Sequence, residues 1–148
     1  MRAVSVRQPW AWAIARGHQP VLNRAAGTGY RGPVAIYASF RADLESFESD
    51  AVRRAISTTW DAADPAAAIG GIVAVVSLAG VCAAATWAAP CGCGAWARPG
   101  AYHWQLADPR PLRWPVQAVG QAGLWELAPA VAGGVARLLA DDAVRAPR

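Results

Sequence analysis

The sequence contains no lysine, because all fourteen of its basic residues are arginines. This absence excludes every mechanism in which a lysine amine acts as a nucleophile or takes a proton. Ten acidic residues leave a net charge of +4. A positive balance of this size only modestly favours a nucleic-acid partner.

Cysteines are also scarce. The three present, Cys82, Cys91 and Cys93, are odd in number and too few for the disulfide framework of a small secreted domain. Cys91 and Cys93, with His103 ten residues further on, have some features of a zinc site. Structural zinc usually takes four ligands at tighter, paired spacings. We therefore expect no metal ion and no other cofactor.

The sequence has no long uninterrupted apolar run. The most apolar stretch, residues 66–85, is broken by Gly70, Gly71, Ser77 and Gly80, which favours a long or bent strand over a membrane span. The amino terminus lacks the charged, apolar and small-residue order of a signal peptide. We therefore expect a cytoplasmic protein with no membrane partner.

Length and periodicity predict one domain built from strands and helices. A chain of 148 residues can bury roughly two thirds of its unfolded surface in one core. We expect one domain over residues 1–128 and a C-terminal helix and tail over residues 129–148. Patterning predicts strands over residues 4–6, 21–24, 32–38, 69–78, 102–106 and 123–127, and helices over residues 9–16, 43–59 and 130–144. The prolines at 109, 111 and 115 predict an irregular connection.

Short motifs follow one another in a fixed order along the chain. Residues 5–11 are S-V-R-Q-P-W-A, residues 17–24 are G-H-Q-P-V-L-N-R and residues 30–33 are Y-R-G-P; later segments are H-W-Q-L, R-P-L and G-Q-A-G-L-W. From about Val4 to Leu127 the chain resembles the ASCH domain, a PUA-like barrel family linked to RNA. The resemblance implies an α+β fold, a small PUA-like β-barrel of about five to six strands flanked by two or three helices.

The chain departs from the family pattern at two positions of the second motif. The pattern has lysine where this chain has Gln19, and glutamate or threonine where it has Leu22. The family includes amidohydrolases acting on acetylated cytidine, in which those two positions and a separate glutamate carry the reaction. The amide of Gln19 cannot take a proton and Leu22 has no polar atom. We do not expect that activity here.

The candidate nucleic-acid-binding residues come from the motifs and from two chemical arguments. Arginines and the N–H groups at a helix start attract phosphate, and aromatic rings stack on unpaired bases. The candidates are Arg7, Gln8, Trp10, Asn23, Arg24, Arg31, Tyr37 and Ser39. Structural alternatives stay open: Arg7 or Arg24 pairs with Glu126, Gln8 only caps the helix, Trp10 packs in the core, and Arg31 lies on the solvated surface.

Three functions follow from these observations. The first is a module that binds RNA or single-stranded nucleic acid in a cleft beside the first helix. The second is an enzyme that hydrolyses RNA or a modified nucleoside, with His18 and Glu126 as the candidate catalytic residues. The third is a protein-interaction domain with a vestigial cleft, because a fold does not fix a function. The oligomeric state is left open.

Overall fold

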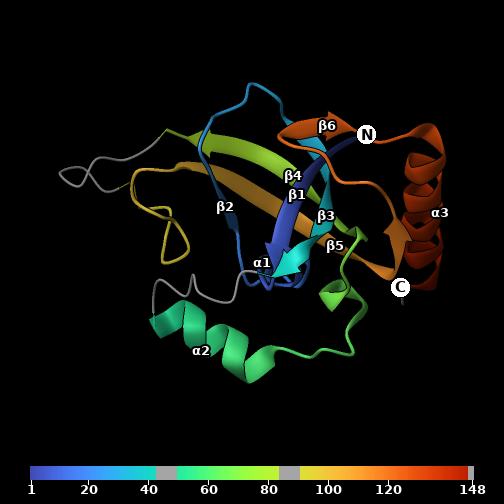
Figure 1. Cartoon of the computed structure of the whole chain (residues 1–148), viewed down its shortest axis with the longest axis horizontal. Coiled ribbons are helices and arrows are strands. Elements are labelled where there is room, and N and C mark those ends of the chain that lie inside the picture. The colour runs from blue at the N-terminus through green and yellow to red at the C-terminus, as the bar shows by residue number, and fades with distance from the viewer. Residues whose placement is uncertain (43–49, 84–90, 147–148) are drawn as a thin grey trace.

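The computed structural model describes residues 1–42, 50–83 and 91–146. One six-stranded sheet with the order β2-β5-β4-β3-β1-β6 forms the centre of the molecule and curls into a half-barrel (Figure 1). The strands are β1 (Arg2–Gln8), β2 (Val21–Arg24), β3 (Gly32–Ala42), β4 (Gly71–Cys82), β5 (Tyr102–Gln117) and β6 (Leu124–Glu126). The helices are α1 (Trp10–Ala15), α2 (Asp50–Thr59) and α3 (Pro129–Arg145), with a 3₁₀ turn, η1 (Pro65–Ala67). The predicted α+β fold, a small barrel of about five to six strands with two or three helices, is confirmed, and its sheet is curled into a half-barrel.

The pairing of β1 leaves part of that strand uncovered. β1 runs parallel to β3 on one side and antiparallel to β6 on the other. β6 pairs only with the residues from Arg2 to Val4. The second half of β1, from Ser5 onward, therefore has no described strand on its β6 side.

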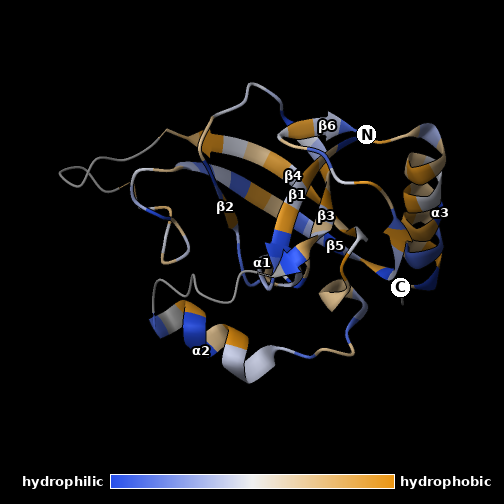
Figure 2. Cartoon of the chain, viewed as in Figure 1, coloured by the Kyte–Doolittle hydropathy of each residue, from blue (hydrophilic) through white to orange (hydrophobic). Residues whose placement is uncertain are grey.

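Two hydrophobic cores cover the two faces of the sheet. The first contains residues of α1 and α2, and the second contains Val135 of α3. In β4, Val73 and Val76 belong to the first core, whereas Ile72 and Val75 belong to the second. Figure 2 shows β4 as hydrophobic along most of its length, as expected for a strand buried on both faces. The prediction of a central strand here is confirmed.

The expected irregular connection after residue 106 is wrong, because β5 continues through three prolines to Gln117. β2 pairs with β5 only at residues 102–105. Beyond Gln105 the described ladder of β5 is with β4, apart from one bond from the Leu106 N–H to the Pro20 carbonyl, and the β4 ladder contains register shifts. A proline has no N–H to donate to a second neighbouring strand, so one-sided pairing and bulges accommodate it.

The first helix has the predicted ends. Pro9 directly precedes α1, and Gly17 follows it with a φ of 77°. This left-handed conformation is one that glycine adopts without strain. The chain can therefore turn sharply from α1 into β2.

The other two helices agree with the predicted positions where the structure describes them. α2 buries Val52 and Ile56 in the first core, and the expected beginning of this helix, at residues 43–49, lies outside the described residues. α3 confirms the predicted terminal helix, and Arg113 of β5 is ion-paired with its Asp142 at 2.5 Å. None of the helices in the described ranges combines the length and apolar character needed to span a bilayer.

Candidate functional site

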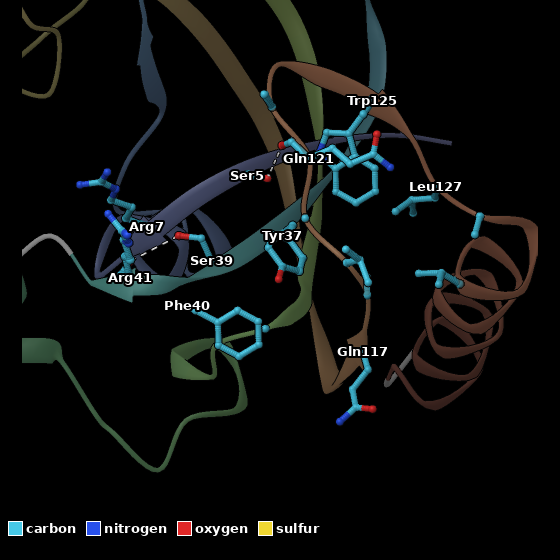
Figure 3. Close-up of a pocket in the computed structure, with 17 residues that line it drawn as sticks. Ser5, Arg7, Tyr37, Ser39, Phe40, Arg41, Gln117, Gln121, Trp125 and Leu127 are labelled. Carbon is cyan, nitrogen blue, oxygen red and sulfur yellow. Dashed lines mark hydrogen bonds between the residues drawn. The ribbon is translucent and has the colours of Figure 1, made fainter.

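Two pockets meet at the uncovered half of β1. Ser5 and Arg7 line both of them. The larger, which we call the groove, has a volume of about 1220 Å³ and extends from the end of β3 towards α3 (Figure 3). The smaller, which we call the small pocket, has a volume of about 270 Å³ and lies beside α1 and β2. Arg7 therefore stands where the two spaces join.

The end of β3 supplies one side of the groove. Ser39, Phe40 and Arg41 line it, and Figure 3 shows Arg41 beside Arg7 at one end. The Phe40 side chain is 72% exposed. The Ser39 hydroxyl donates to the carbonyl of Arg41 at 3.4 Å. This end of the groove thus presents two guanidinium groups and an exposed aromatic ring.

Two aromatic side chains and a connecting segment form the opposite part of the groove. The rings of Tyr37 and Trp125 meet edge to face, with centroids 6.1 Å apart. A Cβ at Gly120 would clash with the Tyr37 ring, so this close approach requires glycine. The connecting segment, residues 117–122, leads from the end of β5 towards β6. The Ser5 hydroxyl donates to the carbonyl of Gln121 at 2.8 Å and holds this segment against β1.

The small pocket contains two tryptophans and a buried amide. The Trp10 and Trp96 rings are perpendicular, with centroids 6.1 Å apart. The Gln19 Nε2 group donates to the carbonyl of Val21 at 2.7 Å. Gln19 is only 5% exposed, and its Oε1 atom is buried without a hydrogen-bond partner among the described residues. A buried acceptor without a donor is unfavourable, and a ligand N–H would satisfy it.

Arg24 connects the two open edges of the half-barrel. Its Nη1 group donates to the carbonyl of Ser5 at 3.3 Å, which joins β2 to β1. Its guanidinium carbon lies 5.8 Å from the centre of the Trp104 ring. Burial lowers the pKa of Arg24, but an arginine side chain stays protonated in proteins. A half-buried positive charge is therefore fixed in the wall of the small pocket.

Asn23 positions a wall of the small pocket. Its Nδ2 group donates to the carbonyl of Trp96 at 2.9 Å, and its Oδ1 atom accepts from the backbone N–H of Arg98 at 2.7 Å. Both amide atoms of Asn23 are thus engaged by the segment that carries Trp96 and Arg98. Its role in the structure is to hold that segment.

Arginines are the only charged residues among the described residues that line the two pockets, namely Arg7, Arg24, Arg41 and Arg98. The guanidinium groups of Arg7 and Arg41 make no hydrogen bond or ion pair with another described residue. Because no described carboxylate lines either space, the local field attracts anions.

Gln8, a predicted binding residue, is used inside the fold. Its Nε2 group donates to the carbonyls of Ala66 and Ala68, each at 2.8 Å. Its Oε1 atom accepts from the backbone N–H of Trp12 at 2.9 Å. Gln8 therefore caps α1 and holds η1, in agreement with the structural alternative, and both of its N–H groups are occupied.

The two candidate catalytic residues line neither pocket. The His18 ring lies against Trp12, with centroids 5.2 Å apart. Glu126 is paired with the Met1 amine at 2.8 Å and with Arg2 at 3.2 Å. The hydrogen bond from the Met1 amine lowers the pKa of Glu126. Among the described residues, the alternative pairing of Glu126 with a pocket arginine is not found.

Arg31 also lies outside both pockets. Its Nη1 group donates to the carbonyls of Thr28 at 2.9 Å and Tyr30 at 2.7 Å, in the exposed turn before β3. The structure thus places six of the eight predicted binding residues around the two pockets and the other two elsewhere. The six are Arg7, Trp10, Asn23, Arg24, Tyr37 and Ser39.

The predicted binding residues do not include Phe40, Arg41, Trp96 and Arg98, which line the pockets. Phe40 and Arg41 belong to β3, which was expected to end at residue 38 but continues to Ala42. The alternation of residues 37, 39 and 41 was the signal that could have found Arg41. Trp96 and Arg98 lie in a segment without periodicity, and only the contacts of Asn23 place them.

No protein-family model matches the sequence, and no curated protein matches it significantly. The structure is similar to the crystal structure of a Tyr-to-Phe mutant of ZmASCH from Zymomonas mobilis. The TM-score is 0.60 with 13% sequence identity, and the match covers 93% of this chain and 96% of the other. The likeness at this identity concerns the fold, which is therefore ASCH-like.

Proposed function

From this ASCH-like fold and its paired pockets, we propose that the protein is a non-catalytic module that binds RNA or single-stranded nucleic acid beside α1. The observation that carries the proposal is the junction at Arg7, where a groove and a small pocket meet and the only charged residues among their described lining residues are arginines. A polyanion with unpaired bases complements both the charge and the aromatic rings of this surface.

The phosphates of the ligand follow the groove. Arg7 and Arg41 stand side by side at its end and have no described partner to compete with a phosphate (Figure 3). Tyr37 and the exposed Phe40 offer aromatic surface along the same groove. Stacking a base on such a ring is worth about 1–3 kcal/mol.

One base enters the small pocket. Its volume of about 270 Å³ admits a single ring system beside the Trp10–Trp96 pair and the Arg24 side chain. The unpaired Oε1 of Gln19 accepts a hydrogen from the base. Adenine, cytosine and guanine can donate it from an exocyclic amino group and uracil from its N3–H, so this contact requires an unpaired base without selecting one of the four.

The non-catalytic part of the proposal rests on the same pocket. Gln19 and Leu22, the two positions where the family pattern has lysine and glutamate or threonine, both line it. Neither can transfer a proton, and the candidates His18 and Glu126 lie elsewhere. A binding role for RNA also agrees with the expected cytoplasmic location.

The test is fluorescence anisotropy with a short single-stranded RNA at two salt concentrations, with the RNA checked for cleavage. We expect binding to weaken with salt, and Arg7→Ala and Arg24→Ala each to lower the affinity; Arg7→Ala, which removes a phosphate contact, should also lower the salt slope by about one unit. Arg137→Ala on α3, outside both pockets, is the matched control and should bind as wild type. Salt-independent binding, or normal binding by both pocket variants, would refute the proposal. Cleaved RNA would favour the hydrolase instead.

A further inference from the structure

A cluster of four metal-ligating side chains lies outside both pockets. Cys82, Cys91, Cys93 and His103 each offer one ligand atom, and all of these atoms lie within 4.8 Å of one another. Cys82 and His103 are directly opposite in the β4/β5 ladder, so the sheet itself brings them together. Cys91 and Cys93 come from the connection between β4 and β5. From this arrangement we propose that the protein holds a structural zinc ion.

The orientation of His103 suits a metal ligand. Its side chain is almost fully buried, and its Nε2 atom lies 2.6 Å from the carbonyl oxygen of Arg98. A carbonyl only accepts hydrogen bonds, so Nε2 carries the proton. In the neutral ring this leaves the lone pair on Nδ1, which lies 3.2 Å from the Cys91 sulfur. A histidine that ligates a metal through one nitrogen commonly donates its other N–H to a carbonyl in this way.

Left-handed glycines lie between and directly after the two neighbouring cysteines. Gly92 and Gly94 have φ values of 71° and 90°. A Cβ at either position would meet nothing within 4 Å, so the glycines are needed for backbone conformation and not for space. Both cysteine sulfurs of this segment lie within the cluster.

The ligand set selects the metal. Three cysteines and one histidine form one of the ligand sets of structural zinc, and thiolates favour zinc over magnesium or calcium. With Zn–S bonds of about 2.3 Å, a tetrahedral site has sulfur atoms about 3.8 Å apart. The largest separation of 4.8 Å in the cluster closes by a shift of about 1 Å, and the Cys91 side chain is exposed.

The competing chemistry is a disulfide between two of these thiols. All three cysteines are free in the structure. A disulfide would use two of the thiols and leave the inward-facing Nδ1 of His103 without a ligand. Zinc engages all four side chains, so it accounts for the position of His103 as well as for the thiols.

The metal site also fixes one wall of the small pocket. Residues 91–103 contain three of the four ligands, and the same segment carries Trp96 and Arg98. Asn23 holds this segment from β2, and His103 holds it from β5. Only this consequence depends on the proposed function, because the zinc site itself is defined without any reference to RNA.

The first experiment measures metal content in protein purified under reducing conditions. We expect about one zinc per chain by elemental analysis. Cys91→Ser should lower zinc affinity at least tenfold. His18→Asn, which changes the other histidine, is the matched control and should keep its zinc.

The second experiment does not depend on whether a variant folds. Wild-type protein is stripped with a chelator, its three free thiols are confirmed, and cobalt(II) is added. A tetrahedral thiolate spectrum, and a rise in melting temperature with zinc but not with magnesium, are expected. Absence of both in the fully reduced protein, or a native disulfide found by mass spectrometry, would overturn the proposal. RNA binding enters neither readout, so this result stands apart from the test of the proposed function.

Discussion

Two buried glutamines near α1 have opposite hydrogen-bonding states. Gln8 gives both N–H groups and its oxygen to backbone partners, whereas Gln19 leaves its Oε1 atom unpaired at the small pocket. A fully bonded buried polar side chain stabilises the fold, and an unpaired one needs another explanation. At the scale of residues, this contrast separates the structural role of Gln8 from the ligand contact proposed for Gln19.

Gln8→Leu should destabilise the protein by about 3 kcal/mol. The substitution removes the partners of two carbonyls, those of Ala66 and Ala68, and of the Trp12 N–H. Each buried backbone group left unpaired costs about 1–3 kcal/mol, partly relieved by water. Urea unfolding measures the effect. A loss below about 1 kcal/mol would show that these bonds are replaceable.

Gln19→Leu should weaken RNA binding while leaving the stability of the protein nearly unchanged. It removes an unpaired acceptor and one hydrogen bond to Val21, so the free energy of unfolding should stay within about 1 kcal/mol of wild type. Affinity for single-stranded RNA should fall about tenfold, because one hydrogen bond to the base is lost. Anisotropy and urea unfolding of the same preparation test both parts. Unchanged RNA affinity would remove Gln19 from the site.

At the scale of elements, a carboxylate joins α1 to η1. Asp64 accepts hydrogen bonds from Arg16 Nε at 2.6 Å, from Trp12 Nε1 at 3.1 Å and from the Ala66 N–H at 2.9 Å. The hydrogen bond from Arg16 is the main reason that the pKa of Asp64 is lowered. Since α1 contains only six residues, this contact and Gln8 hold it in place.

Asp64→Asn should therefore change how stability depends on pH. A pKa that is lower in the folded than in the unfolded state adds stability above the unfolded value, near 3.9, and this is lost as pH falls through the folded value. The variant should lose on the order of 1 kcal/mol at pH 7, because the exposure of Arg16 weakens the pair, and little at pH 2. Urea unfolding across pH measures this. Asp141→Asn, on the exposed face of α3, is the control, and parallel pH curves for wild type and Asp64→Asn would contradict the argument.

The attachment of α3 depends on one face of that helix. Val135 is fully buried in the second core, whereas Val144 on the same helix is 86% exposed. Val135→Ala should cost about 2 kcal/mol, through lost burial and the cavity that remains. Val144→Ala should change stability by less than about 0.5 kcal/mol. Thermal or urea unfolding of the pair tests this, and equal effects would show that α3 is not anchored through Val135.

At the scale of the whole molecule, the half-barrel should distinguish single strands from duplexes. On the proposed function, a base enters the small pocket of about 270 Å³ only after it leaves its stack, which costs a few kcal/mol in a duplex. We expect at least tenfold weaker binding to a blunt RNA duplex than to a single strand of the same sequence. Competition anisotropy measures the ratio. Equal affinities would indicate backbone binding without base insertion.

Local patterns in the sequence determined most of the fold. Gly17 ends α1, residues 21–24 form β2, and the apolar residues of β4 mark the central strand. These elements follow from backbone preferences and short-range periodicity, which neighbouring residues set. The ASCH motifs likewise pointed to the fold that the structure shows. Six of the eight binding residues predicted from these motifs line the two pockets.

Tertiary structure decided what each side chain contacts. The prolines of β5 are tolerated because β2 covers only its first residues, and no local pattern reveals how long a neighbouring strand is. Gln8 turned inward because η1, almost sixty residues away in sequence, offers carbonyls to it. Cys82 and His103 are twenty-one residues apart, yet the β4/β5 register makes them neighbours. Sequence fixes which groups the chain carries, and the pairing of distant strands determines which of them meet.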